Sequence, residues 1–216
     1  WRNNANSNTV GIFLRGIVGG MGLHPIILPS YNNVSLNNAN SNDNGIQLMD
    51  CVECVVYHNN VKDNDHYGIK LHRCSACFVM GNNVCNNSVG FYLYGIVEYI
   101  QITSINYIYH NNFIQNIEQV ELHNCIYDDW DDGYPSGGNC WSDYTGVDLL
   151  SGPYQNVTGS DGIGDTPYII DANNQDRYPL IGVHDVAIVN VEPSDTEVYV
   201  GQIVNITVTV QNQGNF

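Results

Sequence analysis

Residues 3–122 alternate short apolar segments with polar corners in a fixed order. Four segments have the form Gly-Ile/Phe-x-Leu and a fifth lacks the glycine; they begin at Gly11, Gly45, Gly68, Gly90 and Gln119. Successive segments begin 34, 23, 22 and 29 residues apart. A repeat of this length is too thin to bury a core alone. The pattern therefore predicts a solenoid whose units stack on one another.

The motif Asn-Asn-x-x-x-Asn precedes each segment, and its five copies begin at Asn3, Asn37, Asn59, Asn82 and Asn111. Asparagine tolerates the left-handed backbone angles of tight corners, and stacked copies form amide ladders. Within one period the apolar residues alternate over short segments and form no stripe at helical spacing. The alternative is an asparagine-rich disordered tract, but the apolar positions keep register with the asparagines. We therefore predict an all-β parallel β-helix with about 4.8 Å between rungs.

The chain divides into three regions on this pattern: parallel β-helix coils over 1–126, an acidic and aromatic capping tail over 127–182, and the first strands of another domain over 183–216. The two longest steps place extra residues at 15–31 and 94–107, which we expect to form loops on one face of the stack. A solenoid must also cover its last open edge. The aromatic residues that suit this cap are Trp130, Trp141, Tyr144 and Tyr168.

The charge of the chain limits the classes of partner that it can bind. The formal charge is −16, with 6 Lys and Arg against 22 Asp and Glu. Such a surface repels phosphate, so we expect no nucleic-acid partner and no anionic membrane surface. No run of apolar residues is long enough to be a transmembrane segment. The chain begins at Trp1 and ends within a predicted strand at Phe216, so we interpret it as a piece of a longer protein.

The cysteine pairs Cys51-x-x-Cys54 and Cys74-x-x-Cys77 have the spacing of a four-cysteine zinc site. The repeat offers another explanation, because both pairs occupy the same two positions of successive coils. Stacking there requires small, similar residues, and a buried free cysteine behaves as one. Disulfides between rungs are a third interpretation, for which parallel Cβ vectors make closure marginal. We favour a buried ladder of free thiols.

Outward positions of the Gly-Ile-x-Leu segments form two columns along the stack. One contains Phe13, Gln47, Lys70, Tyr92 and Glu121, and the other contains Arg15, Met49, His72, Tyr94 and His123. Aromatic rings that stack on sugar faces are typical of a glycan-binding surface. The candidate ligand-binding residues are Phe13, Lys70, His72, Tyr92 and Tyr94. If the surface is catalytic, Lys70 or Arg73 is the candidate base of a polysaccharide lyase or glycoside hydrolase.

Asp161 and Asp165 are interleaved with glycines, which is typical of a loop that binds a hard cation. Calcium is therefore the candidate cofactor at these two residues. The regular Asp-x-Asp-x-Asp-Gly run and the distal glutamate of an EF-hand are missing. Aspartates that simply shape turns remain the alternative.

These coils resemble the NosD-like right-handed parallel β-helix repeats of archaeal and bacterial surface proteins, a family named for a periplasmic copper-binding protein. The tail resembles the segment that closes many archaeal members, through Trp130–Asn139, Trp141–Tyr144, Gly162–Tyr168 and Arg177–Leu180. The resemblance implies a right-handed β-helix and an exported location. It does not imply copper by itself, because members share the repeat without a common ligand set.

Residues 183–216 resemble the opening strands of a cell-adhesion-related (CARDB-type) immunoglobulin-like domain, and two or three strands cannot close a sandwich. For the whole chain we predict a non-catalytic extracellular or cell-surface protein, periplasmic in a Gram-negative cell, that binds cell-surface glycans or envelope proteins. The alternatives are a polysaccharide lyase or hydrolase acting on the outer face of the β-helix, and a periplasmic copper-binding protein.

Overall fold

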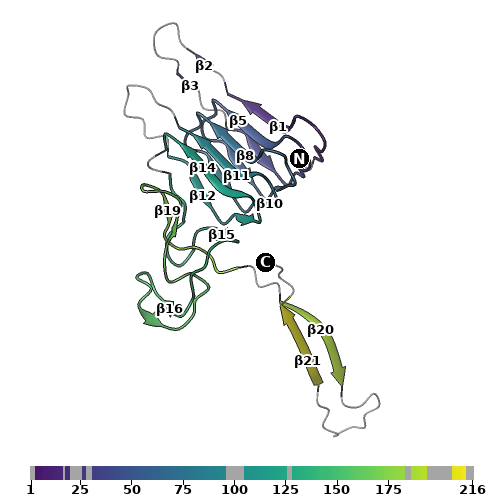
Figure 1. Ribbon diagram of the computed structural model, residues 1–216, viewed down its shortest axis with the longest axis vertical. Helices are drawn as coiled ribbons and strands as arrows, with labels where there is room; N and C mark the ends of the chain where they lie inside the picture. Colours follow the sequence, from purple (N-terminus) through teal and green to yellow (C-terminus); the bar gives the residue numbers. More distant parts are fainter. Residues whose placement is uncertain are drawn as a thin grey trace. The chain divides into compact units, whose positions relative to one another are not determined.

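The computed structural model describes residues 3–16, 18–19, 26–27, 31–95, 105–125, 128–182, 186–193 and 206–212. The described elements are all β-strands, and the chain divides into two compact units, Trp1–Ile181 and Gly182–Phe216. Among the described residues no helix is long and apolar enough to cross a membrane. The first unit is a stack of parallel coils (Figure 1), which confirms the predicted β-helix.

Three parallel sheets form the walls of the β-helix. The five-stranded sheet contains β1 (Val10–Arg15), β5 (Asn44–Met49), β8 (Tyr67–His72), β11 (Val89–Tyr94) and β14 (Glu118–His123), in that order. The second contains β7 (Asn60–Lys62), β10 (Asn83–Cys85), β13 (Asn112–Ile114) and β15 (Cys140–Trp141). The third contains β4 (Asn33–Ser35), β6 (Val55–Tyr57), β9 (Phe78–Met80) and β12 (Tyr107–Tyr109). Neighbouring strands in each sheet come from successive coils.

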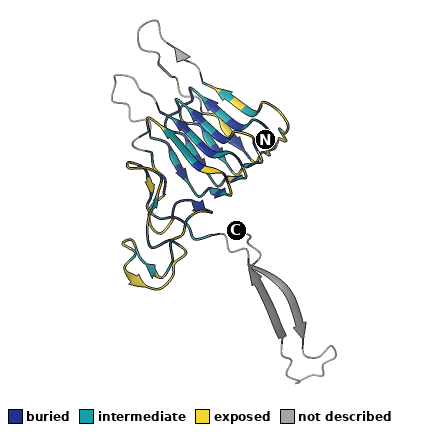
Figure 2. Cartoon of the chain, in the orientation of Figure 1, coloured by how far each residue is buried: buried dark blue, intermediate teal, exposed yellow. Residues whose placement is uncertain are grey.

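Equivalent apolar residues of successive coils lie directly beside one another. Ile46 pairs with Ile69 and Leu48 pairs with Leu71, and all four side chains are fully buried (Figure 2). The preceding glycines also face the core. A Cβ atom on Gly68 would lie 2.7 Å from the backbone oxygen of Gly90, so only glycine allows the rungs to approach this closely.

The buried asparagines form ladders along the stack. The Asn82 Oδ1 atom accepts hydrogen bonds from the backbone N–H and the Nδ2 of Asn59, at 3.0 and 2.9 Å. Its Nδ2 donates to the Val56 oxygen and to Asn111 Oδ1, both at 2.9 Å. Each amide thus satisfies backbone groups that the corner leaves without a strand partner.

The left-handed corners, however, are not at the ladder asparagines, and this part of the sequence interpretation is wrong. The positive φ values belong to the residues just before them, such as His58 (52°), Asp63 (57°) and His110 (56°). The left-handed residue turns the chain, and the next residue then directs its side chain into the core. The ladder asparagines are selected for their amide hydrogen bonds and not for their backbone conformation.

The β-helix continues past residue 126 as a further, partial coil. Asn139 Oδ1 accepts a hydrogen bond from the Asn111 N–H at 3.0 Å, and β15 pairs with β13 in parallel. Asp128 takes the next position of the ladder that contains Asn106, accepting from its N–H at 2.8 Å. A carboxylate suits the last position of a ladder, because it accepts hydrogen bonds and requires no further acceptor.

Aromatic residues of the tail cover this last coil. The ring of Trp141 lies between those of Phe113 and Tyr168, with centroids 4.7 and 4.3 Å away. The Trp141 Nε1 donates to the Asp176 carboxylate at 2.9 Å, and burial raises the pKa of Asp176 to about 7. The rest of the tail is held by short antiparallel pairs: β16 (Leu150–Ser151) with β17 (Val157–Thr158), and β18 (Tyr168–Ile169) with β19 (Gln175–Asp176).

Two other segments contain antiparallel pairs. Within the predicted insertion at 15–31, β2 (Val18–Gly19) pairs with β3 (Ile26–Ile27); most of the second insertion, 96–104, lies outside the described residues. In the second unit β20 (Val186–Pro193) pairs with β21 (Ile206–Asn212), with a register shift between Ile188 and Asn190. The rest of 183–216 is outside the described residues, and the CARDB-type likeness stays a prediction.

Candidate functional site

The outward face of the five-stranded sheet carries the two columns expected from the sequence. Gln47 pairs with Lys70, and Lys70 with Tyr92. In the second column the order is Met49, His72, Tyr94 and His123. The register therefore brings Lys70 beside Tyr92 and His72 beside Tyr94, whereas Phe13 lies two rungs from Lys70.

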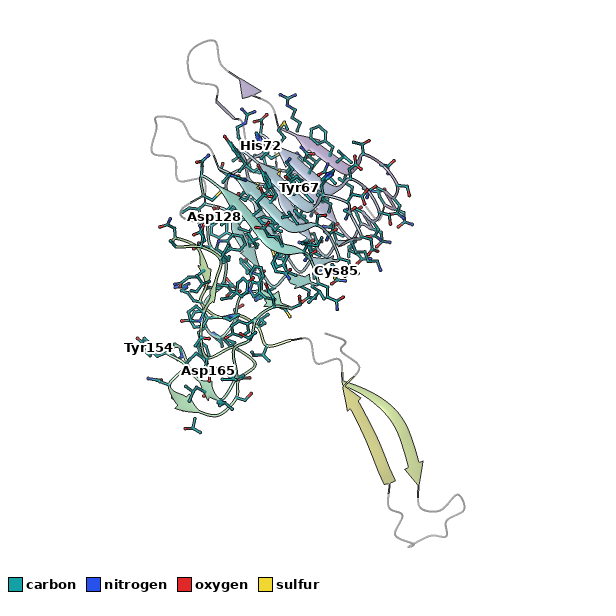
Figure 3. The ribbon with its side chains drawn as sticks, in the orientation of Figure 1. Tyr67, His72, Cys85, Asp128, Tyr154 and Asp165 are labelled. Carbon is teal, nitrogen blue, oxygen red and sulfur yellow. The ribbon has the colours of Figure 1, made fainter. Side chains whose placement is uncertain are left out.

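The residues one position before each glycine form a third outward column, which contains Tyr67 (labelled in Figure 3). Sequence reasoning missed it, because strict alternation from Ile69 would turn Gly68 outward and Tyr67 inward. In the structure Gly68 and Ile69 are both buried, and Tyr67 is half-buried on the outer face. The recurring glycine could have indicated this column. Glycine has no side chain, so it can face inward next to an inward isoleucine and leave the preceding residue outward.

Lys70 lies over two aromatic rings on this face. Its Nζ atom is 4.5 Å from the centroid of the Tyr67 ring and 4.8 Å from that of Tyr92. Attraction between an ammonium and a ring face contributes about 0.5–1 kcal/mol at exposed sites. Partial burial lowers the pKa of Lys70 from its ordinary value, although the more distant Glu121 opposes this. The position of Lys70 is therefore fixed by rings and not by a carboxylate.

His72 and Tyr94 stack face to face, with ring centroids 4.8 Å apart and an angle of 10° between the planes. Burial, followed by the nearby charges of Arg73 and Lys70, lowers the pKa of His72. His72 is thus a neutral hydrogen-bonding group at neutral pH. We call the six residues Tyr67, Lys70, His72, Tyr92, Tyr94 and His123 the aromatic–cationic strip.

The strip offers mainly hydrogen-bond donors to a ligand. The Tyr92 ring contacts Tyr67 and one face of the Tyr94 ring is covered by His72, so stacking of sugars on these rings stays a prediction that depends on their remaining faces. Burial raises the pKa values of Tyr67 and Tyr92, which keeps both hydroxyls protonated. Phenol, ammonium and imidazole groups together can donate to many acceptor oxygens. Among the predicted aromatic residues, Phe13 is half exposed.

A buried ion cluster adjoins the strip at the end of the strands. Asp50 is fully buried and forms ion pairs with Arg73 and, at 3.5 Å, with Arg15. Asp50 and Arg73 have φ values of 54° each, so both are corner residues of adjacent rungs. Arg73, predicted as a candidate base, therefore directs its guanidinium to Asp50, and an arginine holds its proton at any physiological pH.

Replacing Arg73 by alanine is expected to lower the free energy of unfolding by about 1–2 kcal/mol. This is less than for a fully buried ion pair, because the Arg73 side chain is 42% exposed and Arg15 remains near the carboxylate. The measurement is chemical denaturation of Arg73→Ala, Asp50→Asn and the double variant. Neutralising Asp50 should recover much of the loss caused by Arg73→Ala, whereas strictly additive losses would mean that the pair is not coupled.

The four cysteines of the two Cys-x-x-Cys pairs have free thiols and are fully buried in the core. Burial raises the pKa of Cys74 well above its ordinary value, whereas hydrogen bonds with Cys51 and Cys77 lower that of Cys54 to about 3. In the part of the chain that the structure describes, no group of three His, Cys, Asp or Glu side chains has the arrangement of a metal site.

Asp161 and Asp165, the predicted calcium residues, lie in the tail, and Asp165 is labelled in Figure 3. The Asp165 carboxylate accepts hydrogen bonds from the N–H groups of Leu149 and Leu150, and Asp161 accepts from that of Gly152. These contacts hold turns in place. Calcium at the two residues stays a prediction, and a bound ion would have to share these oxygens with backbone donors.

Comparison with known proteins gives one finding. A family model described as periplasmic copper-binding protein (NosD) matches residues 2–146, which is more than half of the chain. The match covers the coils, the partial coil formed by the tail, and every residue of the strip. No curated protein and no solved structure matches.

Proposed function

The chain belongs to the NosD family, and from this premise we propose that it works in the periplasm or outside the cell, where its β-helix binds carbohydrate. The aromatic–cationic strip is the proposed binding surface. The family description supports the location, since it names a periplasmic protein. The β-helix itself supplies the scaffold, because its buried ladders hold the outward side chains in fixed columns.

The observation that carries this proposal is the arrangement of Lys70, Tyr67 and Tyr92. The ammonium lies within 4.8 Å of both ring centroids, and His72 and Tyr94 stack one column away. Sugar recognition requires several donors and acceptors at fixed spacing beside apolar ring edges. Neighbouring residues within a column are one rung, about 4.8 Å, apart, so the columns repeat these groups at a spacing close to the length of one sugar residue.

Copper is not part of the proposal. The buried cysteines pack in the core, and Met49 and His72 supply only two neighbouring ligands on the face. His72 is stacked on Tyr94, and His123 is hydrogen-bonded to Glu121 at 2.8 Å. On the outer face the described residues therefore offer fewer than the three or more soft or imidazole ligands that a tight copper site needs.

The test is a panel of immobilised polysaccharides followed by calorimetric titration of the oligosaccharides that bind. We expect Tyr92→Ala and Tyr94→Ala each to weaken binding about tenfold, because interface tyrosines often contribute this much. The matched control is Tyr109→Ala, which removes a half-buried outward tyrosine from β12 on another sheet.

If Tyr109→Ala and Tyr92→Ala weaken oligosaccharide binding equally, the binding surface is not the strip. No binding to any polysaccharide would refute the proposal. Each titrated sample should also be analysed by mass spectrometry. Unsaturated or shortened products, lost in Lys70→Ala, would replace the binding role with that of a polysaccharide lyase or hydrolase.

A further inference from the structure

Half of the few cationic side chains of this very acidic chain lie on one face or at its corner. The protein has 6 Lys and Arg and a formal charge of −16. Three of these six, Arg15, Lys70 and Arg73, belong to the five-stranded sheet or to its corner. Because the rest of the surface repels anions, such a concentration is where an anionic ligand would be attracted.

The three cations are not equivalent. Arg15 and Arg73 both form ion pairs with Asp50, so much of their charge is already balanced. Lys70 is in no ion pair with another described residue, and its ammonium lies against two rings. A partly desolvated cation without a counter-ion is stabilised when an anion binds beside it.

The groups around Lys70 favour a ligand that is rich in hydrogen-bond acceptors. The Tyr67 and Tyr92 rings lie next to each other, with centroids 4.6 Å apart, and both are near the ammonium, so their protonated hydroxyls add donors to the same region. Asp50 is already paired with Arg15 and Arg73, and the other carboxylates, Glu118 and Glu121, belong to the last strand, β14, two rungs from Lys70. An anion is therefore drawn to the rung of β8, which contains Lys70, and repelled at β14.

We propose that the ligand of the aromatic–cationic strip is a polysaccharide that contains uronic acids, with one carboxylate bound to the Lys70 ammonium. The inference rests on the glycan binding proposed above and specifies the class of glycan. A carboxylate accepts hydrogen bonds from an ammonium and from flanking phenols at the same time. The sugar hydroxyls then lie along the column of His72 and Tyr94.

The experiment compares uronate oligomers that carry free carboxylates with the same oligomers after the carboxylates have been neutralised by esterification. Oligogalacturonate and oligomannuronate are titrated into the protein beside their fully methyl-esterified forms, with dextran sulfate as a polyanion that lacks carboxylates. We expect the free acids to bind at least about tenfold more tightly than their esters, since hydrogen bonds to charged groups are the strong ones. The preference should decline with added salt.

Lys70→Gln should remove most of this preference, and Lys70→Arg should retain it. The matched control is Lys62→Gln, because Lys62 is a half-buried outward lysine on β7 that also lacks an ion pair with another described residue. Thermal unfolding of each variant checks that the fold is intact.

The outcomes separate the two proposals. Equal binding of acids and esters, or binding of neutral polysaccharides alone, overturns the uronate inference and leaves glycan binding standing. Equal or tighter binding of dextran sulfate overturns it as well, because the face would then select charge and not a carboxylate. A loss of preference in Lys62→Gln equal to that in Lys70→Gln would place the anion outside the strip. Binding to no glycan at all defeats both proposals.

Discussion

Asn82→Ala is expected to destabilise the β-helix by about 4 kcal/mol, or to prevent its folding. The Asn82 side chain is fully buried. Its removal leaves the N–H of Asn59 without its acceptor and the Asn59 Nδ2 with one acceptor fewer, and it takes this donor from Val56 O and Asn111 Oδ1. Each buried group left unsatisfied costs about 1–3 kcal/mol. The loss is a large fraction of the stability of a typical domain.

The neighbouring Asn83 is a matched control, since it is exposed and its side chain donates one hydrogen bond, to Asn60 at 3.3 Å. Asn83→Ala should change the free energy of unfolding by less than about 0.5 kcal/mol. Denaturant unfolding followed by far-ultraviolet circular dichroism measures both variants. Similar small losses in the two would show that the amide ladder does not hold the coils together.

Trp141→Ala is expected to have the second large effect, a loss of about 4 kcal/mol. Truncating a buried tryptophan removes about 3–5 kcal/mol through lost packing and the cavity left behind. In this case the ring also separates Phe113 from Tyr168, and its Nε1 donates to buried Asp176. Without the ring the last coil would be exposed to solvent, and the open edge would favour aggregation.

Tyr154→Ala is the control for the cap, because Tyr154 is 83% exposed on the same tail. It should leave the midpoint of thermal unfolding within about 2 °C of the parent. Size-exclusion chromatography after partial unfolding reports on aggregation. If Trp141→Ala and Tyr154→Ala unfold and aggregate alike, the tail does not act as a cap.

The stack and its columns were predictable from the sequence because a β-helix repeats its geometry. Once one coil is aligned on Gly45 and the next on Gly68, the two outward columns and the inward isoleucine and leucine positions follow from the period. The pairing of Met49 with His72, and of Lys70 with Tyr92, is the result. Long-range contacts in such a fold are simply contacts between equivalent positions.

Other features depend on interactions that no repeat predicts. The left-handed residue precedes the ladder asparagine, which is a property of backbone angles and not of composition. The Asp50 cluster joins Arg15 and Arg73 across three rungs, and no spacing rule identifies a single buried carboxylate. The partial coil of the tail was missed because Asn139 stands outside the motif of the earlier ladder residues.

The same stack accounts for both stability and the proposed function. Inward amides and apolar side chains fix the rungs, and the fixed rungs set the distance between outward groups. The strip therefore requires little reorganisation before a ligand binds, which lowers the entropic cost of binding. Variants of the ladder should consequently weaken ligand binding only where they also lower stability.

The most direct measurement is nuclear magnetic resonance of the tyrosine rings during titration with oligogalacturonate, with signals assigned by single Tyr→Phe variants. We predict that the ring signals of Tyr67, Tyr92 and Tyr94 shift together with one saturating curve, while those of Tyr57 and Tyr109 on β6 and β12 stay in place. Shifts confined to Tyr57 and Tyr109, or an absence of saturable shifts at the three strip tyrosines, would contradict the account.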